Sequence, residues 1–264
     1  MSKWVRKHQI PLFFALALAV TWTGFVPFYT SGGESIPWFT FGPALAALAV
    51  AGIANGWAGV QPILAATIRW RVRPIWYVVA LGLPFVAQLV SVLLNPVFGS
   101  AGPHWSAIPP MAQMLPMILL FAIFSGPVGE EIGWRGFALP QLLMRFSALN
   151  ASLILGVVWA VWHLPLILVD DFTTYGALMP VFAAIVFTWV FQNASGSALL
   201  AILMHISHQN SVRYLGRVYD GADKVQQQWI GVAIWVAAVA IILAVHGSRN
   251  FASRRQVAVT PAFE

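Results

Sequence analysis

Residues 125–140 read Ser125-Gly-Pro-Val-Gly-Glu-Glu-Ile-Gly-Trp-Arg-Gly-Phe-Ala-Leu-Pro140, and they place two adjacent carboxylates and a guanidinium in a strongly apolar part of the chain. Ionisable groups at membrane depth are costly, so they are interpreted first as functional. On a helix, Glu131 and Arg135 can pair on one face, whereas Glu130 points about 100° away. One carboxylate is then held by the arginine and the other is available for chemistry.

The same pattern has a simpler alternative. A Glu-Glu-x-x-x-Arg sequence at the cytoplasmic end of a spanning helix also fits a solvated helix end with a surface salt bridge. Two polar sites further along the chain, at His163 and His205, weigh against this alternative because they add ionisable groups to other apolar segments.

The composition indicates a membrane protein. Of the 264 residues, 59% are hydrophobic and 8% are charged, whereas soluble domains carry about 25% charged residues. We expect an all-α, polytopic membrane helix bundle of about eight transmembrane helices, with residues 1–264 forming a single integral membrane domain. The chain has no cysteine, which excludes disulfides, thiol nucleophiles and thiolate metal sites.

Apolar runs between short polar loops predict the positions of the spans. They are expected at about residues 10–29, 38–57, 75–94, 111–128, 151–169, 177–191, 198–214 and 229–245. Pro43 is expected to kink or to start the second span, and Pro127 to bend the fourth.

The basic residues predict the orientation in the membrane. Most of them lie in residues 3–7, 69–73 and 249–255, with Arg135 and Arg145 expected on the same side, and the positive-inside rule assigns these loops to the cytoplasm. We therefore expect a multi-pass protein of the cell membrane with both termini cytoplasmic. The basic residues of segment 213–224 then lie outside, as an exception. Because the positive charge flanks apolar segments, nucleic acid is not an expected partner.

A polar constellation comes from three separate helices. His163 lies in the fifth predicted span, and His205 in the seventh has His208 and Gln209 on the same face. Carboxylates with imidazoles suit a divalent metal such as zinc, or a water activated by a glutamate. No His-Glu-x-x-His motif is present, so the arrangement is not that of the common soluble zinc proteases. The structural alternative is a core histidine or interhelical hydrogen bonding.

These motifs resemble those of the CPBP (CAAX-processing and bacteriocin-processing, or Abi) intramembrane endopeptidases. The run from Gly129 to Pro140 is similar to the first motif of that family. The run from Trp159 to His163 is similar to the second, with Trp where Phe is usual. His205 opens the third, in which Gln209 stands where Asn is usual. The resemblance covers residues 129–209, inside an expected catalytic core of residues 111–215.

The resemblance implies roles for the carboxylates and histidines. Glu130 would activate the attacking water, and Glu131 would assist it or be held by Arg135. His163 and His205 would position the water or, together with Glu131, bind a divalent metal such as zinc. The substrate would be a peptide or protein associated with the lipid bilayer.

The resemblance also implies roles for the amides of the third motif. Gln209, in preference to Asn210, would stabilise the oxyanion, because helical spacing turns Asn210 well away from His205. His208 matches no functional residue of the family. It is expected to contact and orient the catalytic or metal-binding side chains.

Two other functions fit the same residues. A non-catalytic immunity or regulatory protein could use the scaffold to bind a partner, although the intact Glu130, His163 and His205 argue against a decayed site. A proton-coupled transporter could use the carboxylates and imidazoles as a relay. The sequence shows no pair of similar halves, which counts against an inverted-repeat transporter.

Overall fold

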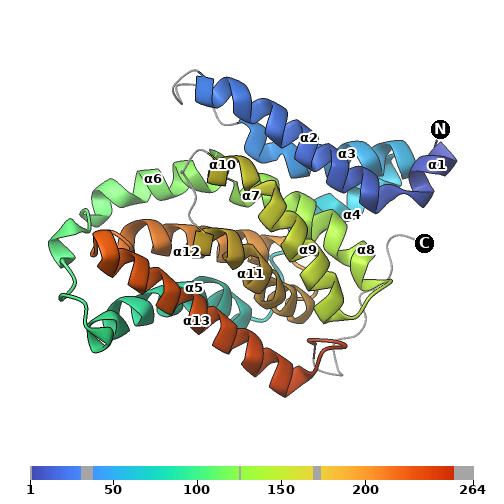
Figure 1. The fold of residues 1–264 in the computed structure, drawn as a ribbon. Coiled ribbons are helices and arrows are strands. Elements are labelled where there is room, and N and C mark those ends of the chain that lie inside the picture. The colour runs from blue at the N-terminus through green and yellow to red at the C-terminus, as the bar shows by residue number, and fades with distance from the viewer. Residues whose placement is uncertain (1, 31–37, 125, 169–173, 253–264) are drawn as a thin grey trace.

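All regular structure in the described part of the chain is helical. The structure is a computed structural model that describes residues 2–30, 38–124, 126–168 and 174–252 (Figure 1). The α-helices are α1 (Ser2–Lys7), α2 (Gln9–Thr30), α3 (Gly42–Asn55), α4 (Trp57–Thr67), α5 (Ile75–Leu94), α6 (Met111–Phe124), α7 (Pro127–Gly133), α8 (Leu139–Leu143), α9 (Ala148–Trp162), α10 (Leu164–Leu168), α11 (Thr174–Asn193), α12 (Ala198–Leu215) and α13 (Gly221–His246). Three short 3-10 turns are η1 (Trp38–Phe41), η2 (Asn95–Phe98) and η3 (Trp105–Ala107), and η4 (Trp134–Ala138) is π-helical.

The expectation of an all-α, polytopic membrane bundle is confirmed. Five of the described helical stretches are long and apolar enough to cross a membrane, and α3 and α9 are shorter apolar helices. Each predicted span has a helical counterpart among the described residues. Ser125, Val169, Arg254 and Arg255 lie outside the described residues.

Local sequence explains where several helices begin. Pro43 lies in the first turn of α3, where its missing N–H costs no hydrogen bond, so it starts the second span and does not kink it. Ser147 caps α9 by accepting from the backbone N–H of Asn150 at 3.2 Å. Ser197 caps α12 in the same way, from the N–H of Leu200 at 3.3 Å.

The structure differs from the predicted spans in three places. The segment between the second and third predicted spans contains a helix, α4, which follows a turn at Gly56. The fourth span is divided, because α6 ends at Phe124 and Pro127 opens a new helix after Gly126 at a φ of 121°. Helix α13 begins at Gly221 and not near residue 229.

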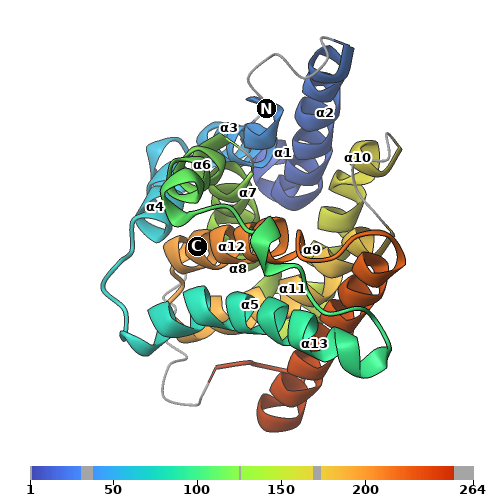
Figure 2. The same cartoon turned by 90° about the vertical axis from the view of Figure 1, so that its left-hand side faces the viewer.

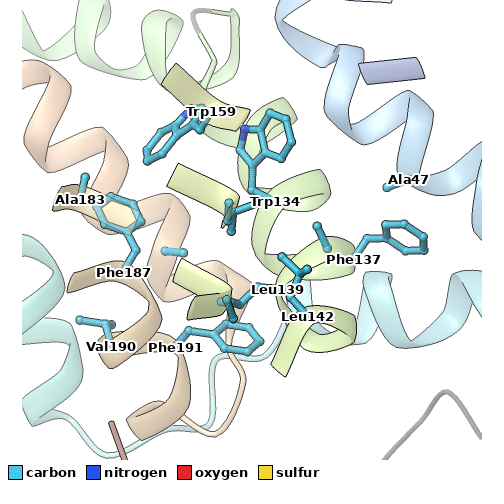
Figure 3. Close-up of a cluster of buried hydrophobic side chains, with 14 of the residues drawn as sticks. Ala47, Trp134, Phe137, Leu139, Leu142, Trp159, Ala183, Phe187, Val190 and Phe191 are labelled. Carbon is cyan, nitrogen blue, oxygen red and sulfur yellow. The ribbon is translucent and has the colours of Figure 1, made fainter. Parts of the chain in front are cut away.

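Helix α12 lies at the centre of the bundle in the end-on view of Figure 2. It packs against α5 and α11, and also against α7 and α6. Helix α3 covers the other side of α7, and α9 packs along α11. Figure 3 shows apolar side chains of this core, among them Trp134, Phe137 and Leu142 from the segment of α7 to α8 and Phe187 and Phe191 from α11. The segment that begins with α7 is therefore enclosed by helices from both halves of the chain.

One end of the bundle collects basic loops, and we call it the basic end. Arg6 Nε donates to Ala54 O at 2.6 Å, which joins the N-terminal helix to the end of α3. Arg69 Nη1 donates to Ser195 O at 3.0 Å, which joins the loop before α5 to the turn before α12. The backbone N–H of Ala148 donates to Arg249 O at 3.0 Å, which places the residues after α13 at the start of α9.

Candidate active site

A face of glycines sets the position of α7. Gly129, Gly133 and Gly136 are spaced four and three residues apart and lie on one side of the helix. A Cβ at Gly129 would lie 2.6 Å from Thr40 O, and a Cβ at Gly133 would lie 2.5–2.6 Å from atoms of Pro43. The glycines therefore let α7 approach the backbone of η1 and α3 closely. The two glutamates that lie between them are directed into the interior of the bundle.

Glu131 is the junction of a buried ionic network. Its Oε1 accepts from Arg135 Nη1 at 2.9 Å and from His205 Nδ1 at 2.9 Å. The side chains of Glu131 and Arg135 are both 0% exposed, so the alternative of a solvated surface salt bridge is wrong. Arg135 is likewise buried inside the bundle. Because an ionised carboxylate oxygen only accepts, Nδ1 of His205 is the donor in this contact.

The guanidinium of Arg135 is also held by aromatic rings. Arg135 belongs to the π-helical segment η4, a type of distortion that is frequent at functional sites. Its Cζ lies 4.4 Å from the ring centroid of Trp159 and 4.6 Å from that of Phe187. Cation–π contacts of this kind stabilise a desolvated charge. A single carboxylate and two rings thus fix the arginine in the core.

Glu130 does not have the unbound carboxylate that the sequence suggested. Its Oε2 accepts from the indole Nε1 of Trp159 at 2.5 Å, and the residue is 3% exposed. Its Oε1 lies against Gly126, where a Cβ would collide with it. Trp159 therefore orients one oxygen of the carboxylate, and the missing side chain of Gly126 makes space for the other.

His163 lies beside this network at the end of α9. Its Nδ1 is 2.9 Å from Trp159 O, and because a carbonyl only accepts, Nδ1 carries the proton. Its ring meets Trp162 edge to face, with the centroids 4.8 Å apart. Trp162 in turn donates from Nε1 to Thr21 Oγ1 at 2.7 Å, which fixes this end of α9 against α2.

The other polar residues of α12 point in different directions. His208 meets Trp235 of α13 edge to face at 5.1 Å between centroids, so it lies outside the Glu131 network. Asn210 donates from Nδ2 to Ile206 O at 2.8 Å, so its amide is turned onto its own helix. Gln209 is partly buried and shares a helical face with His205.

The three predicted metal ligands do not form a metal-binding group. Among the described residues, no three His, Asp or Glu side chains are grouped as ligands of one ion. Glu131 uses Oε1 for Arg135 and His205, and the Nδ1 atoms of both histidines are hydrogen-bond donors. Donation from Nδ1 does not itself exclude a metal, because metal-bound histidines commonly donate their other N–H to a carboxylate or a carbonyl. We derive no chemical step through a metal.

Sequence reasoning missed two aromatic members of the site. Trp159 could have been found from the sequence, because it occupies the position in the second motif where Phe is usual. Its indole N–H is the donor to Glu130. Nothing in the sequence distinguishes Phe187 from the other aromatic residues of the apolar helices. Only the packing of the helices brings its ring over Arg135.

Comparison with known proteins finds a family model that matches the middle of the chain. Residues 112–210 match the family model for the type II CAAX prenyl endopeptidase, Rce1-like. The matched range contains all three motifs, and it also contains Trp159 and Phe187.

A curated relative supports the same assignment. The chain is 32% identical over 137 residues to CAAX prenyl protease 2 of Methanococcus maripaludis, which covers 44% of this chain and 48% of that protein. The chain thus spans about half the length of the curated relative that it matches. Through residues 112–210, which carry the three motifs, this multi-pass membrane protein is similar to the CAAX prenyl endopeptidases, in agreement with the resemblance of its motifs to the CPBP family.

Proposed function

We propose that this protein is an intramembrane endopeptidase of the CAAX prenyl protease type, in which Glu130 activates a water molecule. The observation that carries the proposal is the buried network in which α7, α9 and α12 bring Glu130, Trp159, Glu131 and His205 together. Buried carboxylates and imidazoles inside a membrane bundle are costly for stability, and a catalytic role accounts for that cost.

The geometry supports a distinct role for each carboxylate. Glu130 has one oxygen fixed by Trp159, and its other oxygen takes the proton of the water as the oxygen of that water attacks the peptide carbonyl carbon. The same proton then passes to the leaving amine as the carbon–nitrogen bond breaks. Glu131 is bound to Arg135 and His205, so its role is to orient His205 and to balance the buried arginine.

The histidines and Gln209 complete the proposed mechanism. His163 and His205 position the water through Nε2, because Nδ1 of each ring is committed as a donor. Gln209 donates its side-chain amide to the oxyanion of the tetrahedral intermediate. Asn210 is a poorer candidate for that role, because its Nδ2 is bonded to Ile206 O.

A metal requirement stays a prediction, although the arrangement of Glu131, His163 and His205 gives it no support. Treatment of the purified protein with EDTA or 1,10-phenanthroline tests it. Retained cleavage is the outcome expected for water activated by Glu130 alone, and inhibition reversed by added zinc would restore the metal to the mechanism.

The proposed substrate is a membrane-associated peptide or protein. The relative from Methanococcus maripaludis is named as a prenyl protease, and a prenylated C-terminal peptide is accordingly the first substrate to test. We also propose that the protein resides in the cell membrane with both termini in the cytoplasm, as the charges of its loops indicate.

The direct test is a comparison of peptide termini in membranes that contain wild-type protein or Glu130→Gln. This substitution keeps an acceptor oxygen for Trp159 but removes the base. New termini that appear only with the wild type, at equal protein levels, are the expected result. Identical termini in the two membranes would favour the non-catalytic binding protein.

A further inference from the structure

The middle of α2 is joined to the end of α9 that carries His163, although α2 lies outside the residues that the family model matches. Trp162 Nε1 donates to Thr21 Oγ1 at 2.7 Å, and Trp22 Nε1 donates to Trp162 O at 3.3 Å. Two hydrogen bonds in opposite directions therefore connect residues that lie 140 and 141 positions apart in the chain.

Trp162 is also a packing partner of the imidazole of His163. The two ring centroids lie 4.8 Å apart, with the ring planes at 87° to each other. His163 stands where α9 ends and α10 begins, so its side chain does not belong to the regular row of a continuous helix. The direction of the ring depends instead on its contacts, which are the bond from Nδ1 to Trp159 O and the packing on Trp162.

The contact between Thr21 and Trp162 is buried. Thr21 is 2% exposed and Trp162 is 4% exposed. Gly42, at the start of α3, lies so close to Thr21 that a Cβ there would collide with the hydroxyl oxygen. A buried indole N–H that loses its acceptor costs free energy, and a rotation of the indole toward another acceptor would disturb its packing on His163.

We propose that Thr21 and Trp22 are positioning residues for His163, an assignment that rests on the proposed endopeptidase function. Thr21 fixes the indole on which the imidazole packs, and Trp22 fixes the carbonyl at the end of α9. His163 holds the attacking water in the proposed mechanism. The functional unit then includes α2, which lies outside the residues 111–215 that the motifs predict as the catalytic core.

The test compares threonine variants of the full-length protein in nanodiscs. Thr21→Val keeps the volume of the side chain but removes the acceptor oxygen, whereas Thr21→Ser keeps that oxygen. Thr23→Val is the matched control, because Thr23 is exposed on the same helix and its Oγ1 donates to Ala19 O at 2.7 Å. Cleavage of a farnesylated peptide, followed by mass spectrometry, gives kcat and KM for each variant.

Thr21→Val should lower kcat by about tenfold, as loss of one hydrogen bond typically does, with KM nearly unchanged. Thr21→Ser should recover most of kcat, and Thr23→Val should behave as the wild type. Trp22→Phe should have a smaller effect in the same direction, because the bond from its indole is longer.

A double-mutant cycle shows whether Thr21 acts through the indole of Trp162. In a Trp162→Phe background the effect of Thr21→Val on kcat should disappear, because no indole N–H remains to lose its acceptor. An equal effect in both backgrounds would overturn the proposal. A lower melting temperature of Thr21→Val with unchanged kcat would overturn it as well, because Thr21 would then only hold α2 in place.

A spectroscopic measurement separates this proposal from the proposed function. The chain has six histidines, and selective ¹⁵N-histidine labelling, with His163→Gln as the reference, identifies the ring signals of His163 without any substrate. Thr21→Val should shift or broaden these signals, and Thr23→Val should leave them in place. If the wild type cleaves no peptide but the His163 signals respond to Thr21→Val, the endopeptidase function fails and the positioning of His163 stands. Unchanged signals in Thr21→Val overturn the positioning, whatever the rate of cleavage.

Discussion

The hydrogen bond between Trp159 and Glu130 predicts a specific effect of a mild substitution. Trp159→Phe keeps a ring over Arg135 but removes the only N–H that this side chain can donate to Glu130. Hydrogen bonds to charged groups contribute about 1.5–3 kcal/mol, so we expect kcat to fall by about tenfold or more with a smaller change in KM. Steady-state kinetics on a cleaved peptide measures both constants.

Trp159→Leu is the matched comparison, because it removes the hydrogen bond and the cation–π contact together. It should lower the melting temperature, whereas Trp159→Phe should leave it nearly unchanged. A Trp159→Phe enzyme with wild-type kcat would show that the indole does not orient the base.

The ion pair of Glu131 and Arg135 makes a prediction about stability. Arg135→Ala leaves a fully buried carboxylate with only His205 as a partner, and loss of one member of a buried pair costs about 3–5 kcal/mol. Unfolding of the protein in mixed detergent micelles measures the loss. The double variant Glu131→Leu/Arg135→Met removes both charges and should recover most of the stability but not the activity. Wild-type stability of Arg135→Ala would contradict the buried pairing.

At the scale of residues, local contacts were predictable and tertiary contacts were not. The pairing of Glu131 with Arg135 follows from helical spacing alone. The bonds from Trp159 to Glu130 and from His205 to Glu131 connect residues 29 and 74 positions apart. These bonds depend on how α9 and α12 pack on α7. The motifs indicated that the residues share one site, but they did not indicate which side chain bonds to which.

The glycine face of α7 makes a prediction at the scale of an element. Gly133→Ala would place a Cβ 2.5–2.6 Å from Pro43, including its backbone carbonyl, so α7 must move away from α3. Overpacking of this kind costs about 1–3 kcal/mol, and the shift also displaces Glu130 and Glu131. We expect a lower melting temperature together with a large loss of cleavage.

Gly82→Ala is the control for this experiment. Gly82 lies inside α5, and a Cβ there would meet nothing within 4 Å. Alanine exceeds glycine in helix propensity by about 1 kcal/mol, so this variant should be equally or more stable and fully active. If Gly133→Ala behaved in the same way, close approach of α7 to α3 would not be what positions the glutamates.

The elements themselves were largely predictable, with errors where an apolar run changes direction. The apolar runs predicted a helix at each expected span, and five of the helical stretches are long and apolar enough to cross a membrane. The prediction missed α4, because the basic residues from Arg69 onward indicated a loop and the helix before them is only Trp57–Thr67. The Gly126–Pro127 pair indicated that the helix is interrupted before α7. The same pair is compatible with a bend in one helix and with the start of a new helix, so the sequence did not distinguish the two.

At the scale of the whole molecule, the loops divide into two groups at opposite ends of the bundle. The basic end joins Arg6, Arg69 and Arg249 to neighbouring segments. At the other end, the backbone N–H of Ala101 donates to Asp223 Oδ2 at 3.0 Å, and that of His104 donates to Val218 O at 2.9 Å. Residues 95–110 and 216–220 therefore lie on the side opposite to the basic end.

This division predicts the orientation of the protein, because loops rich in Lys and Arg stay in the cytoplasm. The chain has no native cysteine, so Ser100→Cys and Ser248→Cys each introduce a single thiol at opposite ends of the bundle. A membrane-impermeant maleimide added to intact cells should label Ser100→Cys, and it should label Ser248→Cys only after the membrane is opened. Both proteins unfolded in SDS serve as the control for reactivity. Labelling of Ser100→Cys only from the cytoplasmic face would show that the orientation is the reverse of the predicted one.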